Sequence, residues 1–216
     1  MTRFQYFFYP FAKAILRVFC FWPYSGCVIG AENVPKDGAF LLTPSHRSML
    51  DIPWVSMCTS RRVRFMGKAS AFSMPIVGSL FKLLGGFPVA RDGSDRGPLR
   101  DSLKILAAGE PLAVFPEGTR QRGDKIGELQ QGAAYLAIKS QVPVVPIALY
   151  DTERTWRGQS KFPSLGGPGI VLVGKALVPP VTQSSVVKRE VVEAFTAQLH
   201  EEMQSLWDQA KAIAAK

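Results

Sequence analysis

Cysteine and histidine are both scarce in this chain of 216 residues. The cysteines are Cys20, Cys27 and Cys58, and an odd number without paired spacing argues against both a disulfide framework and a zinc site. We therefore expect small, buried, apolar thiols in a reducing compartment. The histidines are His46 and His200, so His46 is the natural candidate if the chain performs proton transfer near neutral pH.

Several common catalytic and nucleotide-binding motifs are also missing. The sequence contains no Gly-x-Ser-x-Gly elbow, no Walker loop, no dinucleotide-binding Gly-x-Gly-x-x-Gly after a strand, and no cluster of His and Cys ligands. Hydride transfer, nucleotide hydrolysis and zinc chemistry therefore lose their main support.

Acidic residues are outnumbered by basic ones, 17 to 26, which gives a net charge of +9. Such a surface favours nucleic acid, anionic lipid headgroups or phosphorylated substrates as partners. Arg61, Arg62 and Arg64 are clustered, and we expect them to face headgroups or solvent. No stacking aromatic motif accompanies the basic residues, which disfavours nucleic acid.

Charges also interrupt the hydrophobic N-terminus. Residues 1–27 are rich in aromatic side chains, but Lys13 and Arg17 share one helix face, and Pro10 and Pro23 bracket the run. This pattern predicts an amphipathic helix that anchors the chain at the membrane interface, with its cations among the headgroups. The alternatives are a cleaved or spanning segment and a helix that packs on its own domain.

Short apolar runs alternate with helical patterns in residues 28–216, which predicts a single layered α/β domain. We expect a mostly parallel or mixed central sheet flanked by helices. The expected strands are residues 39–43, 63–66, 87–89, 112–115, 142–149 and 170–173, and the expected helices are 51–58, 73–84, 98–108, 128–139 and 188–216. The last helix is amphipathic and is either continuous or broken once, whereas Pro143 and Pro146 indicate that strand 142–149 is an edge or irregular strand.

His46 directly follows the first of these strands, and Asp51 follows five residues later. A carboxylate near an imidazole can hold the ring in one tautomer and stabilise the imidazolium that forms. The pair fits best with His46 in the strand-to-helix loop and Asp51 in the first turn of the helix. The alternative is a helix cap beside a solvated histidine.

Two further segments suit an anion. Arg91 follows strand 87–89, and residues 115–120, Phe-Pro-Glu-Gly-Thr-Arg, form a turn that ends in Arg120; arginine matches the geometry of phosphate oxygens. Gly118 permits close backbone approach and Thr119 offers a hydroxyl. Surface turns and local ion pairs are the alternatives for both segments.

Lys68 could add charge to the same site. Glu117 would repel phosphate, so we expect it to hold Arg120 or another cation, or to bind the hydroxyl of the acceptor. His46, Arg91 and residues 116–120 all follow strands, and the carboxyl ends of strands are where ligands bind in open α/β sheets.

Taken together, these segments resemble the glycerolipid acyltransferases typified by bacterial 1-acyl-sn-glycerol-3-phosphate acyltransferase. The four blocks that carry the resemblance are residues 46–51, 86–91, 115–120 and 142–147. The blocks agree in order and spacing, and the resemblance extends over about residues 28–180. Ser45 departs from the asparagine that often precedes the histidine, and the N-terminal region is short for a pair of anchoring helices.

The resemblance implies that His46, oriented by Asp51, removes the proton from an acceptor hydroxyl, which then attacks an acyl thioester. Acyl-CoA or acyl-carrier protein would be the co-substrate, and neither a metal nor a bound organic cofactor is needed. Arg91, Arg120, Gly118, Thr119, Glu117 and Lys68 would bind the acceptor.

The implied acceptor is 1-acyl-sn-glycerol-3-phosphate, and the product is phosphatidate. The alternatives are another lysophospholipid, glycerol 3-phosphate or a phosphorylated glycolipid, and, in a different class, a non-enzymatic peripheral membrane protein. We expect membrane lipids as partners and a peripheral or monotopic position on the cytoplasmic face of the cell membrane.

Overall fold

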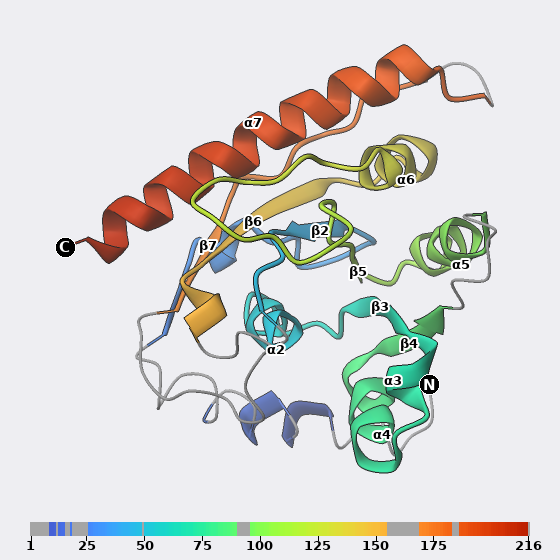
Figure 1. Ribbon diagram of the computed structural model, residues 1–216. Coiled ribbons are helices and arrows are strands. Elements are labelled where there is room, and N and C mark those ends of the chain that lie inside the picture. The colour runs from blue at the N-terminus through green and yellow to red at the C-terminus, as the bar shows by residue number, and fades with distance from the viewer. Residues whose placement is uncertain are drawn as a thin grey trace.

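The computed structural model describes residues 9–11, 13–15, 18, 26–48, 50–89, 96–154, 169–182 and 186–215. Its centre is a seven-stranded sheet in the order β1-β7-β6-β2-β5-β3-β4 (Figure 1). The strands are β1 (Cys27–Ile29), β2 (Leu41–Pro44), β3 (Arg64–Lys68), β4 (Gly86–Val89), β5 (Leu112–Ala113), β6 (Val144–Tyr150) and β7 (Ile170–Val173). All neighbouring strands are parallel except β6 and β7, so the expected mixed α/β sheet is confirmed.

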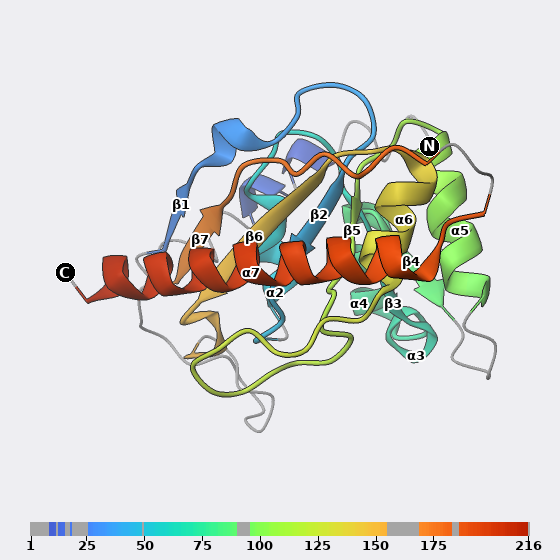
Figure 2. The same cartoon turned by 90° about the horizontal axis from the view of Figure 1, so that it is seen from above.

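Helices cover both faces of this sheet. They are α2 (Asp51–Ser56), α3 (Ala69–Phe72), α4 (Pro75–Leu84), α5 (Arg96–Ala107), α6 (Gly132–Ser140) and α7 (Arg189–Ala214), with 3-10 turns η1 (Ala31–Asn33) and η2 (Thr152–Arg154). Helices α6 and α7 lie on one face, and α2 and α4 lie on the other (Figure 1). Figure 2 shows α7 crossing the sheet over β6 and β7, with which it makes most of its contacts.

Side-chain alternation divides the core into two layers. In β6, Val144 and Ala148 pack toward α6 and α7, whereas Val145 and Ile147 pack on the opposite side around the fully buried Trp54. The period of two along each strand sends successive apolar residues to opposite faces. A sheet buried on both faces requires continuous apolar strands, which is why β6 and β7 lack the polar alternation of a surface strand.

Strand β6 corrects one expectation. It lies between β7 and β2, so the edge alternative is wrong, and β6 runs without a break from Val144 to Tyr150. Pairing with β7 begins only at Ile147, opposite Val173, and Pro146 accepts a hydrogen bond from the Gly174 N–H at 2.9 Å. Pro146 therefore lies one residue before the part of β6 that pairs with β7, where its missing N–H costs little.

Smaller differences concern element ends. Helix α6 begins at Gly132 instead of residue 128, β5 ends at Ala113, and α7 is a single unbroken helix. Cys58 is buried as expected, and burial raises its pKa to about 12; Cys27 is only partly buried, and Cys20 lies outside the described residues.

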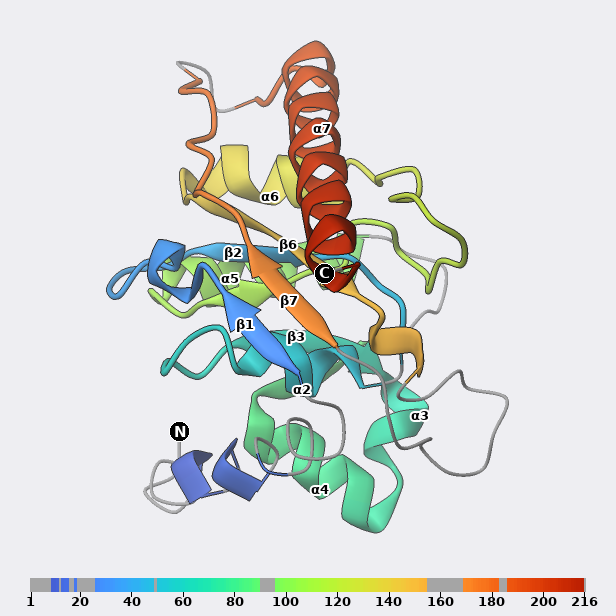
Figure 3. The same ribbon diagram turned by 90° about the vertical axis from the view of Figure 1, so that its left-hand side faces the viewer.

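The described part of the N-terminal segment is helical and contacts the domain on one side. Tyr9 is buried, and its hydroxyl donates to the Arg61 carbonyl at 3.2 Å. Lys13 donates to the Thr59 carbonyl, so it contacts the domain, while Arg17 lies outside the described residues. In Figure 3 this helix lies on the α4 side of the sheet, opposite α7. Across the described residues, every helix falls short of the length and apolarity that crossing a bilayer requires.

Gly85 provides a test of how α4 leads into β4. Its φ is +108°, and a Cβ there would lie 2.3 Å from the Val63 carbonyl oxygen. Gly109 has a φ of +75° but open space around its Cβ position. We expect Gly109→Ala to lower the free energy of unfolding by about 1 kcal/mol and Gly85→Ala by about 3 kcal/mol, measured by urea denaturation. Equal losses would show that the clash with Val63 is relieved at no cost.

Candidate active site

Two loops meet at the carboxyl edge of the sheet. His46 lies in the loop after β2, and residues 115–121, hereafter the second loop, follow β5. Leu41 pairs with Leu112 and Leu42 with Ala113, so the two loops leave neighbouring parallel strands at the same edge. Arg91 lies outside the described residues, as does the side chain of Lys68 at the end of β3.

The expected contact between His46 and Asp51 is present. The His46 Nδ1 lies 2.8 Å from the Asp51 Oδ2, and Asp51 is the first residue of α2. An Nδ1–H that donates to the carboxylate leaves Nε2 as the basic nitrogen. The His46 side chain is 24% exposed, and no described residue hydrogen-bonds its Nε2. This geometry replaces the alternative of a solvated histidine beside a helix cap.

Asp51 is held rigidly by three further donors. Its Oδ2 accepts from the backbone N–H groups of Arg47 at 2.6 Å and Ser48 at 2.8 Å, and its Oδ1 accepts from the Thr152 hydroxyl at 3.0 Å. The carboxylate is 1% exposed. Buried anions require such hydrogen bonds, and the bonds also fix the oxygen that faces His46.

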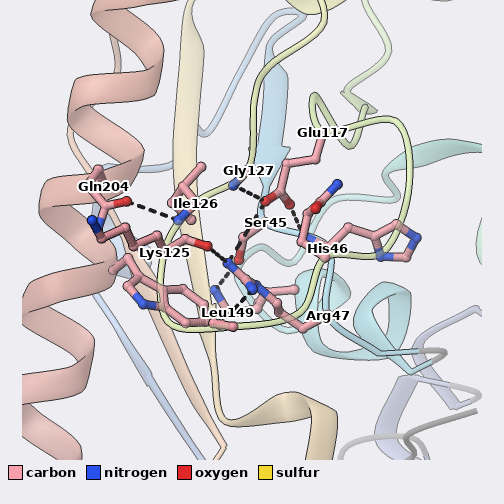
Figure 4. A network of polar contacts seen from close by, with 12 residues as sticks. Ser45, His46, Arg47, Glu117, Lys125, Ile126, Gly127, Leu149 and Gln204 are labelled. Carbon is pink, nitrogen blue, oxygen red and sulfur yellow. Dashed lines mark hydrogen bonds and ion pairs between the residues drawn. The ribbon is translucent and has the colours of Figure 1, made fainter.

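The second loop holds His46 on three sides. The His46 N–H donates to the Glu117 Oε2 at 2.6 Å, the His46 carbonyl accepts from the Gln121 N–H at 2.8 Å, and the imidazole stacks on Phe115 at 4.1 Å between ring centroids. Figure 4 shows the ring pointing away from the buried side chains of this network. The base therefore sits on a fixed backbone while its ring reaches toward solvent.

Glu117 is turned into the protein and is buried. Its Oε1 accepts from the Gly127 N–H at 2.8 Å and lies 3.9 Å from the Arg47 guanidinium (Figure 4). The expectation that Glu117 binds substrate is therefore corrected. Of the roles considered, the structure supports the one in which Glu117 holds a cation. That cation is Arg47, not Arg120.

Arg47 completes this buried network. Its guanidinium stacks on the Trp207 ring at 4.0 Å and donates to the carbonyls of Gly123, at 3.1 Å, and Lys125. Trp207 in turn donates to the Asp124 carbonyl at 3.1 Å. The network thereby connects the His46 loop to α7, far along the chain.

The end of the second loop is exposed. Gly118 has a φ of +71° and donates to the Phe115 carbonyl at 3.1 Å, which closes a tight turn. The Thr119 hydroxyl accepts only a 3.3 Å bond from the Gln121 amide. Arg120 makes no hydrogen bond or ion pair with the described residues, so its five N–H donors are available to an anion.

Arg47, Thr152 and Trp207 are the site residues that sequence reasoning missed. The sequence shows that Arg47 directly follows His46, but no local pattern predicts that its side chain is buried. Thr152 is 101 residues from Asp51 and has no motif around it. Next to it, burial, reinforced by the charges of Asp151 and Asp51, raises the pKa of Glu153.

Comparison with known proteins now decides the family. The profile of the Acyltransferase family matches residues 26–150. The chain belongs to this family.

Relatives of the chain agree with that result. It is 28% identical over 180 residues to a chloroplastic 1-acyl-sn-glycerol-3-phosphate acyltransferase of Brassica napus, covering 82% of this chain and 50% of the relative. A protein of the same name from Chlamydomonas reinhardtii is 33% identical over 159 residues, 72% of this chain and 48% of that one. The chain thus spans about half the length of these curated relatives.

The fold also matches a solved structure. The crystal structure of the 1-acyl-sn-glycerophosphate acyltransferase from Thermotoga maritima superposes with a TM-score of 0.75 at 21% identity, covering 95% of this chain and 80% of that chain. The family match contains His46, Asp51 and the second loop, but not Thr152 or Trp207. No group of three metal-binding side chains lies within the described residues.

The Arg47–Glu117 contact predicts a coupled loss of stability. Glu117→Gln should lower the free energy of unfolding by about 3 kcal/mol, because it leaves the buried Arg47 without its counter-charge. The double variant Glu117→Gln, Arg47→Met should lose less than the sum of the two single variants, since no buried cation remains. Urea denaturation of the three variants measures the coupling, and strictly additive losses would contradict it.

Proposed function

We propose that the protein transfers a fatty acyl group from an acyl thioester to the free hydroxyl of 1-acyl-sn-glycerol-3-phosphate, giving phosphatidate in phospholipid biosynthesis. The observation that carries the proposal is the partly exposed His46 imidazole, with its Nδ1 bonded to a buried carboxylate and its Nε2 without a partner among the described residues. The acceptor named for the curated relatives supports the choice of substrate.

In the proposed reaction, the His46 Nε2 removes the proton from the acceptor hydroxyl. The oxygen attacks the thioester carbonyl of acyl-CoA or acyl-carrier protein, and the C–S bond breaks. The imidazolium, stabilised by Asp51, then returns its proton to the leaving thiolate. These reaction steps need neither a covalent acyl-enzyme nor a metal.

Arg120 is the proposed ligand of the acceptor's phosphate, with the Gly118–Thr119 turn beside it. A free, exposed guanidinium on the loop that holds His46 would place the phosphate near the base and orient the hydroxyl. Such positioning can contribute about 7–11 kcal/mol in well-oriented systems. Arg91 and Lys68 remain proposed contributors on the strength of the family resemblance.

The N-terminal helix is the proposed membrane contact, on the cytoplasmic face and in a peripheral or monotopic position. Phe11, Ile15 and Val18 are 65%, 55% and 57% exposed, and their spacing of four and three residues forms one apolar stripe. Large apolar side chains aligned in this way suit the acyl boundary of a bilayer.

His46→Ala should abolish turnover, because no other group takes up the hydroxyl proton. The assay is release of free thiol from acyl-CoA or acyl-carrier protein, dependent on 1-acyl-sn-glycerol-3-phosphate. His200→Ala, which removes the other histidine from helix α7, is the matched control and should retain activity. Near-normal thiol release by a folded His46→Ala protein would rule out His46 as the base.

Arg120→Ala should mainly raise the KM for the acceptor, by about tenfold to a hundredfold, the range expected for a lost charged hydrogen bond. Arg122→Ala removes an exposed cation two positions away and serves as the control. Unchanged acceptor kinetics in Arg120→Ala would remove this residue from the substrate site.

A further inference from the structure

A second basic site lies at the opposite edge of the sheet from His46. Arg61, Arg62 and Arg64 lead into β3, and together with Tyr9 and Glu110 they line a pocket of about 590 Å³. Arg64 begins β3, whereas His46 and the second loop follow the ends of their strands. The pocket is therefore separate from the proposed acceptor site at Arg120.

The three arginines have too little negative charge around them. Their one carboxylate partner among the described residues is Glu110, 3.5 Å from the Arg64 guanidinium. Arg61 donates to the carbonyls of Gly38 and Gly109, and Arg62 to that of Lys82. These carbonyls satisfy N–H groups but do not neutralise a cation.

Two donors in this cluster are buried without any acceptor. The Nε atoms of Arg62 and Arg64 are shielded from solvent and have no hydrogen-bond partner within the described part of the chain. Burial, together with the charge of Arg64, lowers the pKa of Arg62. An anion in the pocket would offset the uncompensated positive charge, since it supplies negative charge close to the three guanidinium groups.

The pocket lies beneath the N-terminal helix. Tyr9 lines its wall and donates to the Arg61 carbonyl, and the apolar stripe of Phe11, Ile15 and Val18 lies in the same N-terminal segment. If that stripe enters the acyl boundary, the pocket comes to lie next to the headgroup layer. Figure 3 shows this helix on the α4 side of the sheet, away from α7.

We propose that Arg61, Arg62, Arg64 and Tyr9 form a site for the phosphate of an anionic phospholipid headgroup, distinct from the site that holds the acceptor. The proposal rests on the membrane seating proposed above, though not on catalysis. Inorganic phosphate shares the chemistry of this ligand, but the adjacent apolar stripe favours a lipid.

Vesicle binding distinguishes the proposed headgroup site from the membrane contact of the apolar stripe. The full chain is mixed with vesicles of phosphatidylcholine alone or with added phosphatidylglycerol, and co-sedimentation is measured at constant ionic strength. The double variant Arg62→Gln, Arg64→Gln should lose the extra binding conferred by phosphatidylglycerol, by on the order of tenfold to thirtyfold. Its binding to phosphatidylcholine vesicles, which reports the apolar stripe, should be unchanged.

The control variant Lys175→Gln, Lys188→Gln removes the same charge from exposed positions outside the pocket and should lose about twofold or less. Arg62→Lys, Arg64→Lys keeps the charge and should retain most of the binding, which separates loss of charge from misfolding. Equal losses in the two Gln variants would overturn the site in favour of diffuse attraction. Saturable competition by inorganic phosphate at matched ionic strength, with no preference for phosphatidylglycerol, would overturn the lipid as its ligand.

Discussion

The buried carboxylate of Glu117 is the constraint on which the proposed active site depends. One of its oxygens accepts from the His46 backbone and the other from Gly127, close to the Arg47 guanidinium. A buried carboxylate is stable only when its lone pairs and its charge are satisfied. Meeting that requirement fixes the loop after β2 against the second loop, so the base is positioned by its backbone before any substrate binds.

This constraint extends well beyond the loops themselves. Arg47 stacks on Trp207 of α7, and Thr152 after β6 orients Asp51. Helix α7, which covers one face of the sheet, therefore helps to hold the residues at the carboxyl edge of the sheet. The family match ends at residue 150, so part of the support for the histidine lies outside the segment by which the family is recognised.

The two edges of the sheet would serve different purposes under our proposals. The carboxyl edge carries the partly exposed imidazole of His46 and the exposed Arg120, where the chemistry would occur. The opposite edge carries three arginines below the N-terminal helix, where the chain would meet charged lipid. A sheet with both faces covered by helices leaves its edges and ends for ligands, and the distribution of basic residues follows that division.

The sequence by itself determined the order of the strands and helices other than β1 and α3, the pairing of His46 with Asp51, and the family, because apolar periodicity and short-range spacing are local properties. It did not determine that Glu117 is buried, that Lys13 contacts Thr59, or that β6 lies inside the sheet despite Pro146. Those outcomes depend on which distant segments supply partners, as Gly127, Arg47 and Gly174 do. Only the tertiary structure decides such partners, since burial and charge compensation arise between residues that are remote in the chain.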